Sequence, residues 1–255
     1  MNIVDKLEWK ENYLDAIILN ISDINKNYSK QLLFALKPGG HIITINDKVK
    51  YHRNTIALED MGFEIRDQII WFFGDDSKSL CLGRKPLSEK TIVDNVIKWG
   101  TGGINIEGCR IGTEPISHGT SKMDIRGKLG DFHTRDRITV EDHITEGRFP
   151  ANILFDETAA ELLDEQTGIL KGDSPNRGPR KMVSQPYFQL DSANMDRIGD
   201  NHKKYSGDGG ASRFFYITKS NQDLIDYLTK LITPEKGTIL IYTISCNENY
   251  TTINQ

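Results

Sequence analysis

The sequence predicts an α/β fold, in which a Rossmann-like sheet carries helices on both faces and long irregular loops. Short apolar runs rich in isoleucine alternate with segments of helical periodicity through the first hundred residues. The same alternation returns after residue 212. Strands that alternate with helices are joined by crossover connections, and these are typical of a layered, largely parallel sheet.

In the first half of the chain, residues 13–19 (YLDAIIL) form an apolar run that predicts a buried strand. Residues 23–36 have apolar side chains at helical spacing, with Asp23 as the expected N-cap. Residues 37–40 (KPGG) should end this helix in a turn, because proline cannot continue a helix and glycine accepts positive φ. The same patterns predict strands at 41–46, 65–73 and 80–83, and helices at 49–61 and 91–99.

In the second half, we expect strands at 151–155, 213–218 and 238–245, and helices at 157–166 and 222–232. The segments 110–146 and 168–211 are polar, contain glycine and lack periodicity, so they predict irregular loops. The tail after residue 245 predicts no element. We therefore divide the chain into 1–109, the first part of the α/β domain; 110–212, recognition loops with an inserted strand and helix at 147–167; and 213–255, its last part.

The charge of the chain is unevenly distributed. The formal net charge of the 255 residues is −4, but segment 110–137 has an excess of two basic residues and segment 171–204 an excess of three. The remainder therefore carries −9. A basic excess confined to two loops can mark a surface that faces a polyanion, although solvated loops would show the same composition.

Composition also limits the class of protein. The three cysteines, Cys81, Cys109 and Cys246, form no CxxC pair, which argues against a disulfide framework or a cysteine zinc site. The histidines of the loops show no metal-like spacing, so we expect no metal site. No apolar stretch approaches the length of a membrane span, and the first residues do not resemble a signal peptide. We expect a soluble, cytoplasmic protein with no membrane partner.

Several segments of the sequence resemble those of the DNA amino-methyltransferases, which use S-adenosylmethionine to methylate adenine N6 or cytosine N4. The similarity is greatest to the phage and prophage type, whose catalytic strand comes first and whose cofactor strand comes last. It rests on residues 36–41 (LKPGGH), 51–71, 84–113 (RKPLSEKTIVDNVIKWGTGGINIEGCRIGT), 147–156 (GRFPANILFD) and 209–219 (GGASRFFYITK). The resemblance covers about four fifths of the chain and implies one methyltransferase domain with target-recognition loops.

The resemblance also implies where catalytic residues should lie. Members of the family have a D-P-P-Y type signature after the first strand, whose side chain and backbone accept hydrogen bonds from the target amine while the aromatic residue stacks on the flipped base. Here the strand continues into residues 20–23 (NISD). Asn20 therefore takes the position of the acid, and Asp23 is the other candidate for that role.

The cofactor end departs further from the family pattern. Relatives have an acidic strand end and a glycine loop after the last helix, whereas this chain has Ile241 at the acid position and no glycine after Gly237. The next two strands of the family would lie beyond Gln255, so we expect a truncated sheet. The residues that match the cofactor pocket of relatives are Phe214, Phe215, Tyr216 and Lys219, although alternating core residues of a strand would look the same. We expect S-adenosylmethionine to bind relatives but not this chain.

In this interpretation the basic loop residues contact DNA phosphates. The candidate DNA-binding residues are Arg110, Lys122, Arg126, Lys128, Arg135, Arg137, Lys171, Arg177, Arg180 and Lys181. Two further partners are a second copy of the chain, which would cover the open edge of a shortened sheet, and an active methyltransferase.

Four hypotheses about function follow. The leading hypothesis is a catalytically degenerate methyltransferase homologue that binds DNA or serves as a partner subunit in a modification or anti-restriction system. The second is an active enzyme with a non-standard site that uses Asn20 or Asp23, completed by another chain. The third is a decoy that inhibits a host defence protein, and the fourth is a decaying gene product without a present function.

Overall fold

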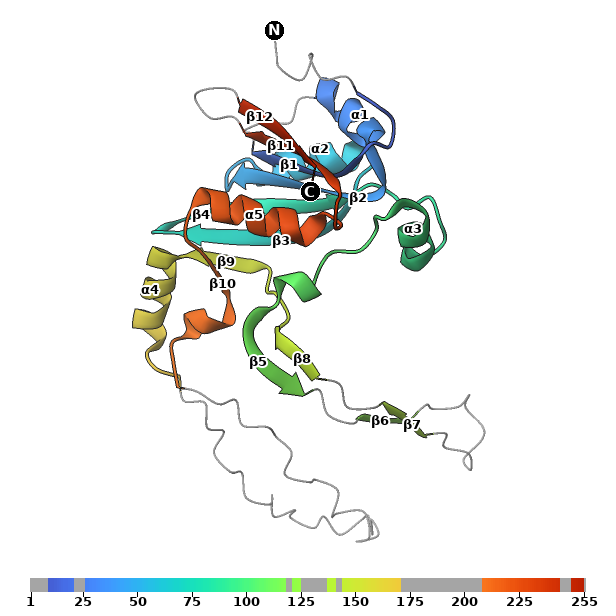
Figure 1. Ribbon diagram of the computed structural model, residues 1–255. Coiled ribbons are helices and arrows are strands. Elements are labelled where there is room, and N and C mark those ends of the chain that lie inside the picture. The colour runs from blue at the N-terminus through green and yellow to red at the C-terminus, as the bar shows by residue number, and fades with distance from the viewer. Residues whose placement is uncertain are drawn as a thin grey trace, which may run out of the picture.

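The computed structural model describes residues 9–20, 26–117, 121–124, 137–140, 144–170, 208–243 and 249–254. Eight strands form one mixed sheet in the order β10-β9-β3-β4-β2-β1-β11-β12 (Figure 1). They are β1 (Leu14–Asn20), β2 (Leu36–Asp47), β3 (Glu64–Phe73), β4 (Asp76–Arg84), β9 (Ile153–Asp156), β10 (Tyr216–Thr218), β11 (Thr238–Thr243) and β12 (Asn249–Asn254). In this sheet β4 and β12 run antiparallel to their neighbours. The carboxyl ends of the other six strands therefore meet at one edge.

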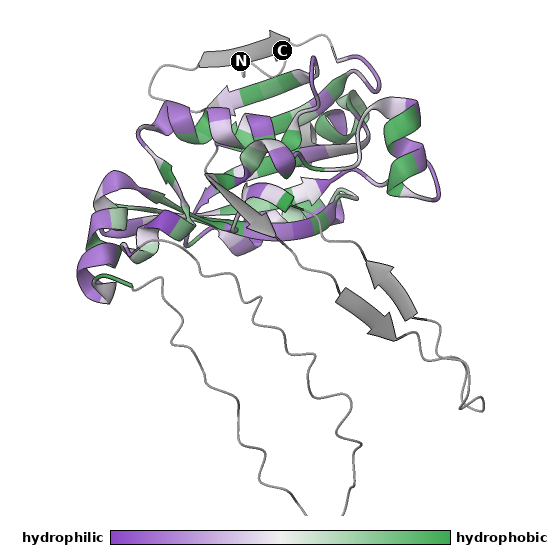
Figure 2. Cartoon of the chain, turned by 60° about the horizontal axis from the view of Figure 1, so that its bottom comes forward, coloured by the Kyte–Doolittle hydropathy of each residue, from purple (hydrophilic) through white to green (hydrophobic). Residues whose placement is uncertain are grey.

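Helices cover both faces of this sheet. The helices are α1 (Lys26–Ala35), α2 (Tyr51–Asp60), α3 (Ile92–Trp99), α4 (Glu157–Thr167) and α5 (Asn221–Ile232), with 3-10 turns η2 (Glu107–Cys109) and η4 (Ala211–Phe214). Alternate residues of β1 serve two core layers: Ile18 packs with α5 and Ile17 with α1 and α2. Figure 2 shows the hydrophobic residues concentrated in the strands between the helices. The predicted α/β sheet with helices on both faces is confirmed.

One prediction near the start of the chain was wrong. Residues 37–40 form no turn, because β2 begins at Leu36, directly after α1. Leu36 pairs with Leu14, and the register of β1 against β2 shifts between Leu14 and Ala16. Gly39 lies within this irregular stretch of β2, and its φ of +80° lies in the left-handed region. The glycine pair therefore permits a bulge inside a strand.

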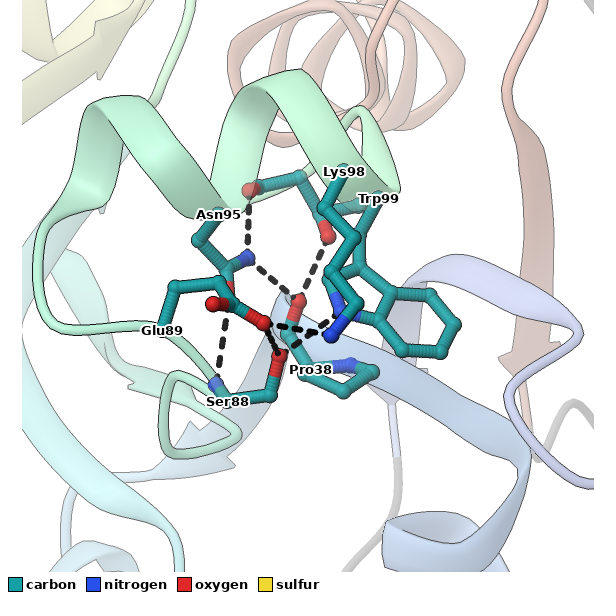
Figure 3. A network of polar contacts seen from close by, with 7 residues as sticks. Pro38, Ser88, Glu89, Asn95, Lys98 and Trp99 are labelled. Carbon is teal, nitrogen blue, oxygen red and sulfur yellow. Dashed lines mark hydrogen bonds and ion pairs between the residues drawn. The ribbon is translucent and has the colours of Figure 1, made fainter.

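A buried amide at this bulge holds α3 against β2 (Figure 3). The Asn95 side chain is fully buried, and its Nδ2 donates to the carbonyl oxygens of Pro38 and Thr101, at 2.8 Å each. Its Oδ1 accepts from the backbone N–H of Ser88 at 3.0 Å. Proline has no N–H for a sheet ladder, but its carbonyl is fully used here. The inner side of α3 is thus anchored by hydrogen bonds rather than by apolar contacts.

Segment 110–146 contains strands, contrary to the prediction of an irregular loop. β5 (Ile111–Ser117) pairs antiparallel with β8 (Ile144–Arg148), and β6 (Ser121–Asp124) pairs with β7 (Arg137–Val140). Figure 1 shows both ribbons lying outside the main sheet and its helices. A two-stranded ribbon outside the core needs no buried face, so its sequence lacks the alternation that reveals a half-buried strand.

Two predictions for the last part of the chain were also wrong. Of the strand predicted at 213–218, Arg213 and Phe214 belong to η4, and β10 begins at Tyr216. The tail was predicted to have no element, but β12 pairs antiparallel with β11. Its sequence, NYTTIN, is too polar to reveal a strand from an apolar run. β12 covers the edge of β11 that the prediction left open for a second copy.

The predicted division at residues 109 and 212 stays a prediction. β9, from the predicted insertion, lies between β3 and β10 in the main sheet, so the central segment contributes to the core. Within the described ranges, no helix has both the length and the apolar character that a bilayer crossing requires.

Candidate binding pocket

A pocket of about 260 Å³ opens at the carboxyl ends of β3, β9 and β10. The three strands are parallel neighbours, and α4 and α5 begin where β9 and β10 end. The carboxyl edge of a parallel sheet is where α/β proteins generally bind ligands. The lining residues are Trp71, Phe73, Asp156, Glu157, Thr158, Thr218, Lys219, Ser220 and Asn221.

The floor of this pocket is aromatic and held in place. Trp71 is buried and stacks on Phe73, with ring centroids 4.7 Å apart. The indole Nε1 donates to the Thr218 hydroxyl at 3.1 Å, and that hydroxyl donates to the carbonyl oxygen of Phe155 at 3.2 Å. Because the indole has one N–H and that N–H is satisfied, the ring is fixed in orientation.

Side chains of the chain itself cap both helices that begin at the pocket. The Asp156 carboxylate accepts from the N–H groups of Ala159 at 2.7 Å and of Gly74 at 3.1 Å. At α5, the Ser220 hydroxyl accepts from the N–H of Asp223 at 3.1 Å. These caps use N–H groups that would otherwise attract an anion. The pocket therefore offers an aromatic floor and a polar rim rather than a phosphate cradle.

Tyr216 precedes the pocket residues Thr218 and Lys219 on the chain, but its own contacts are structural. Burial and the hydrogen bond that its hydroxyl donates to Asp223, at 2.9 Å, raise the pKa of Tyr216 to about 12. The same carboxylate accepts from the N–H of Lys219 at 2.9 Å, and the Tyr216 ring stacks on Tyr227 with centroids 4.0 Å apart. The phenol therefore stays protonated at neutral pH, and it contacts Asp223 and Tyr227.

The four residues predicted to bind a cofactor do not gather in one place. Lys219 lines the pocket, and within the described part of the chain its Nζ forms no ion pair. Phe215 packs edge-to-face on Phe155 at 5.1 Å, while the Phe214 ring contacts the guanidinium groups of Arg148 and Arg213. A cofactor role for any of them stays a prediction.

Asn20, the candidate catalytic residue, lies at the same edge of the sheet but in a different part of it. It is half-buried at the end of β1, where it pairs in register with Thr243 of β11 and with Ile45 of β2. β1 and β10 are separated by five strand spacings, or about 24 Å at ~4.8 Å each. The structure therefore does not bring Asn20 together with Lys219. Asp23 lies outside the described residues.

One candidate DNA-binding side chain can be placed. Arg110 precedes β5, and its guanidinium makes two hydrogen bonds to the Glu107 carboxylate, at 2.7 and 2.6 Å. Lys122 and Arg137 belong to β6 and β7, whose backbone alone is described. The remaining candidates lie outside the described residues: Arg126, Lys128, Arg135, Lys171, Arg177, Arg180 and Lys181.

The buried titratable groups stand apart from the pocket. Burial, with Arg84 and Arg66 nearby, lowers the pKa of His41 in β2 to about 4. Burial raises the pKa of the thiols of Cys81 and Cys109, so neither is an activated nucleophile. In the ranges that the structure describes, no three His, Cys, Asp or Glu side chains gather to hold a metal ion.

Comparison with known proteins gives a distant structural similarity. No protein-family model matches the sequence, and no curated protein matches it. Among solved structures, the M1.HpyAVI–SAM complex is similar over 29% of this chain and 45% of that one, with 17% identity and a TM-score of 0.27. A putative DNA modification methylase from Thermus thermophilus, complexed with S-adenosyl-L-methionine, is similar over 33% of this chain and 51% of that one, with 11% identity and a TM-score of 0.29. The chain thus spans about half the length of these structures.

Sequence reasoning missed the pocket, and it missed the contact of Arg148 and Arg213 with the Phe214 ring. Trp71 and Thr218 are 147 residues apart in sequence, so no local motif joins them. Only a weaker sequence signal for the pocket was available. It consists of an aromatic strand end at 71–73 and of two predicted helices that begin directly after strands. Arg148 and Arg213 fall within phrases that resemble the family, but neither lies in a basic run.

Proposed function

We propose that this chain is a methyltransferase-fold protein that binds duplex DNA and does not transfer a methyl group. The observation that supports the proposal is the pairing of β1 with β11. The resemblance identifies β1 as the catalytic strand and β11 as the cofactor strand. In the sheet the two are parallel neighbours, and their carboxyl ends are in register at Asn20 and Thr243.

The side chains on these two strands argue against methyl transfer. Asn20 stands in place of the acid at the end of β1. On β11, Ile241 stands in place of the cofactor acid, and it packs against the apolar layer beneath α5. A branched apolar side chain supplies neither a carboxylate nor the close backbone approach that a glycine loop gives a ligand.

Binding of duplex DNA is supported by charge and by shape. Of the basic residues of segment 110–137, Arg110 precedes β5, Lys122 belongs to β6 and Arg137 to β7, and these strands lie outside the main sheet (Figure 1). Lys and Arg residues on such ribbons would contact the phosphates of a duplex, which gives affinity but no sequence information. The sheet would then support the ribbons instead of holding a reacting base.

Two measurements on the purified chain test the proposal. With duplex DNA and S-adenosylmethionine labelled on the methyl group, we expect no label in the DNA. By fluorescence anisotropy, we expect the chain to bind the duplex with an affinity that falls as salt rises, with a logarithmic slope of about −0.9 per phosphate contact. Label in the DNA would overturn the non-catalytic part of the proposal. A salt slope of zero would overturn the DNA-binding part.

A further inference from the structure

The outer face of α3 is apolar, which reverses the usual arrangement of a helix on a sheet. Four large aliphatic side chains are exposed on this helix: Ile92, Val93, Val96 and Ile97, at 44%, 67%, 41% and 80%. In the part of the chain that the structure describes, none of the four belongs to the two core layers. The side that faces β2 carries the buried amide of Asn95 instead. A helix normally turns its apolar stripe to the core and its polar side to water, so this face is suited to contact with another molecule.

The helix is held in place without the use of this face. The Thr91 hydroxyl caps its first turn by accepting from the N–H of Asp94 at 3.1 Å. Ile92 and Val96 lie beside the backbone of Gly102, where an added Cβ would come within 3.5 Å of each side chain. The apolar face is therefore already formed in the single chain, and little ordering is needed when it binds a partner.

The exposed apolar area of α3 suits a small interface. Helices α2 and α4 leave one large hydrophobic side chain each exposed, Ile56 and Leu162, as is normal for a protein surface. The exposed fractions of the four side chains on α3 amount to more than two whole side chains, or roughly 200–300 Å² at ~100 Å² each. Two such faces with a polar rim fall within the class of interfaces below about 1,200 Å², which is typical of weak and transient complexes.

The charges around the face favour a second copy of the chain over DNA. Residues 88–99 contain two acidic and two basic residues, so they carry no net charge. Lys98 forms an ion pair with Glu89, and the Asp94 carboxylate accepts from the Thr91 hydroxyl at 2.7 Å. A surface with this balance does not attract the phosphates of DNA, and two copies of it do not repel each other.

The order of the four apolar residues is self-complementary. Residues 92–97 read IVDNVI, in which the apolar positions form a palindrome. Two such helices that run in opposite directions about a two-fold axis at its centre bring Ile92 against Ile97 of the second copy. The same axis brings Val93 against Val96. In both pairs the more exposed side chain of one helix meets the less exposed side chain of the other, so the two faces can interdigitate.

We propose that α3 is a dimer interface, at which two copies of the chain pack this face in opposite directions about a two-fold axis. In Figure 1 the helix lies at the periphery of the molecule, where a second copy can approach it. The interface does not use the edge of β11, which β12 covers. Because it is small, the dimer is weak, and the chain is monomeric at micromolar concentration. This inference goes beyond the proposed DNA binding and does not rest on it.

Sedimentation equilibrium from micromolar to millimolar concentration tests the interface. We expect the mean mass of the original chain to rise from that of a monomer towards that of a dimer. Ile97→Lys puts a charge into both symmetric contacts, so the affinity should fall at least about tenfold. Ile169→Lys is the matched control, because Ile169 is 75% exposed after α4; it should associate like the original chain. Thermal melting checks that each variant is folded. An original chain that stays monomeric, or equal association of Ile97→Lys, would overturn the interface.

A mixture of two variants tests the antiparallel pairing. Ile92→Glu should weaken self-association as Ile97→Lys does. In the mixture the introduced acid and base meet at one contact, while the other contact keeps its two isoleucines. We therefore expect the mixture to associate at least about tenfold more tightly than either variant alone. Sedimentation velocity with a fluorescein label on one variant measures this. No gain in the mixture would overturn the antiparallel pairing, because the two positions do not meet when the helices are parallel. Neither experiment bears on duplex binding, which tests the proposed function separately.

Discussion

Asn20 and Thr243 are register partners at the carboxyl ends of the parallel strands β1 and β11. Five strand spacings separate β1 from β10, after which Lys219 lines the pocket. A reaction that needs groups from both places would have to span about 24 Å, because neighbouring strands lie ~4.8 Å apart. The geometry therefore separates the expected site of catalysis from the pocket.

This separation predicts that restoring the acid at the end of β1 does not restore chemistry. We expect Asn20→Asp to show no methyl transfer to duplex DNA, as in the original chain, because β11 still has Ile241 in place of the acid and no glycine follows Gly237. Transfer of a labelled methyl group is the measurement, with Asn20→Ala as the matched control. Label in the DNA with Asn20→Asp but not with Asn20→Ala would contradict the prediction.

The buried amide of Asn95 predicts a large loss of stability on substitution. Asn95→Leu leaves the buried Thr101 carbonyl and the partly buried Ser88 N–H without their partner, so we expect the free energy of unfolding to fall by about 3 kcal/mol. Urea denaturation measures the change. Val93→Ala on the same helix is the control; its side chain is 67% exposed, and we expect a change within about 0.5 kcal/mol. If Asn95→Leu lowered the free energy of unfolding by less than about 1 kcal/mol, water would be replacing the hydrogen bonds of the Asn95 amide.

The glycine of the β2 bulge gives a second prediction about the same contact. Gly39 has a φ of +80°, and a Cβ there would collide with the Asn95 Nδ2. Gly100 has a similar φ of +77°, but nothing lies within 4 Å of its Cβ position. Both Gly39→Ala and Gly100→Ala should lower the free energy of unfolding by about 1–2 kcal/mol, because alanine must then adopt the left-handed conformation. Only Gly39→Ala must also displace the Asn95 amide, so it should lower the free energy of unfolding by about 2 kcal/mol more than Gly100→Ala. Urea denaturation of the two variants tests this, and equal losses would contradict it.

Elements that bury an apolar face could be predicted closely from the sequence. The helix expected at 222–232 is observed at Asn221–Ile232, because its apolar side chains pack on the sheet at helical spacing. The β5–β8 ribbon could not be predicted, because it lies outside the main core and its pattern carries no burial signal. The Pro38–Gly39 bulge was misread for another reason. Its residues favour a turn locally, while pairing with β1 and hydrogen bonds from Asn95 and Thr101 hold them in a strand.

The candidate site was less predictable than the fold. Asn20 could be placed at a strand end from the sequence, since it follows a buried apolar run. The pocket could not, because its floor joins Trp71 to Thr218 across the sheet and its rim comes from two helix starts. Such a site is defined by strand order, which composition and local periodicity do not specify.

The last prediction concerns the pH dependence of stability, and it follows from His41. Its pKa is about 4 in the folded chain, against 6.5 for an exposed histidine, because burial disfavours the charged ring and Arg84 repels it. Between pH 6.5 and 4 the unfolded chain therefore binds a proton that the folded chain excludes. Stability should fall as the pH drops through this window, by about 3 kcal/mol from this group. Urea denaturation at several pH values measures the loss.

His41→Gln separates this effect from that of the carboxyl groups that titrate in the same range. We expect the variant to lose less stability than the original chain between pH 6.5 and 4, whatever its stability at neutral pH, because glutamine binds no proton. His52→Gln, which changes an exposed histidine on α2, is the matched control and should follow the original chain. If His41→Gln and the original chain lost stability in parallel over this range, the histidine would already be protonated in the folded protein.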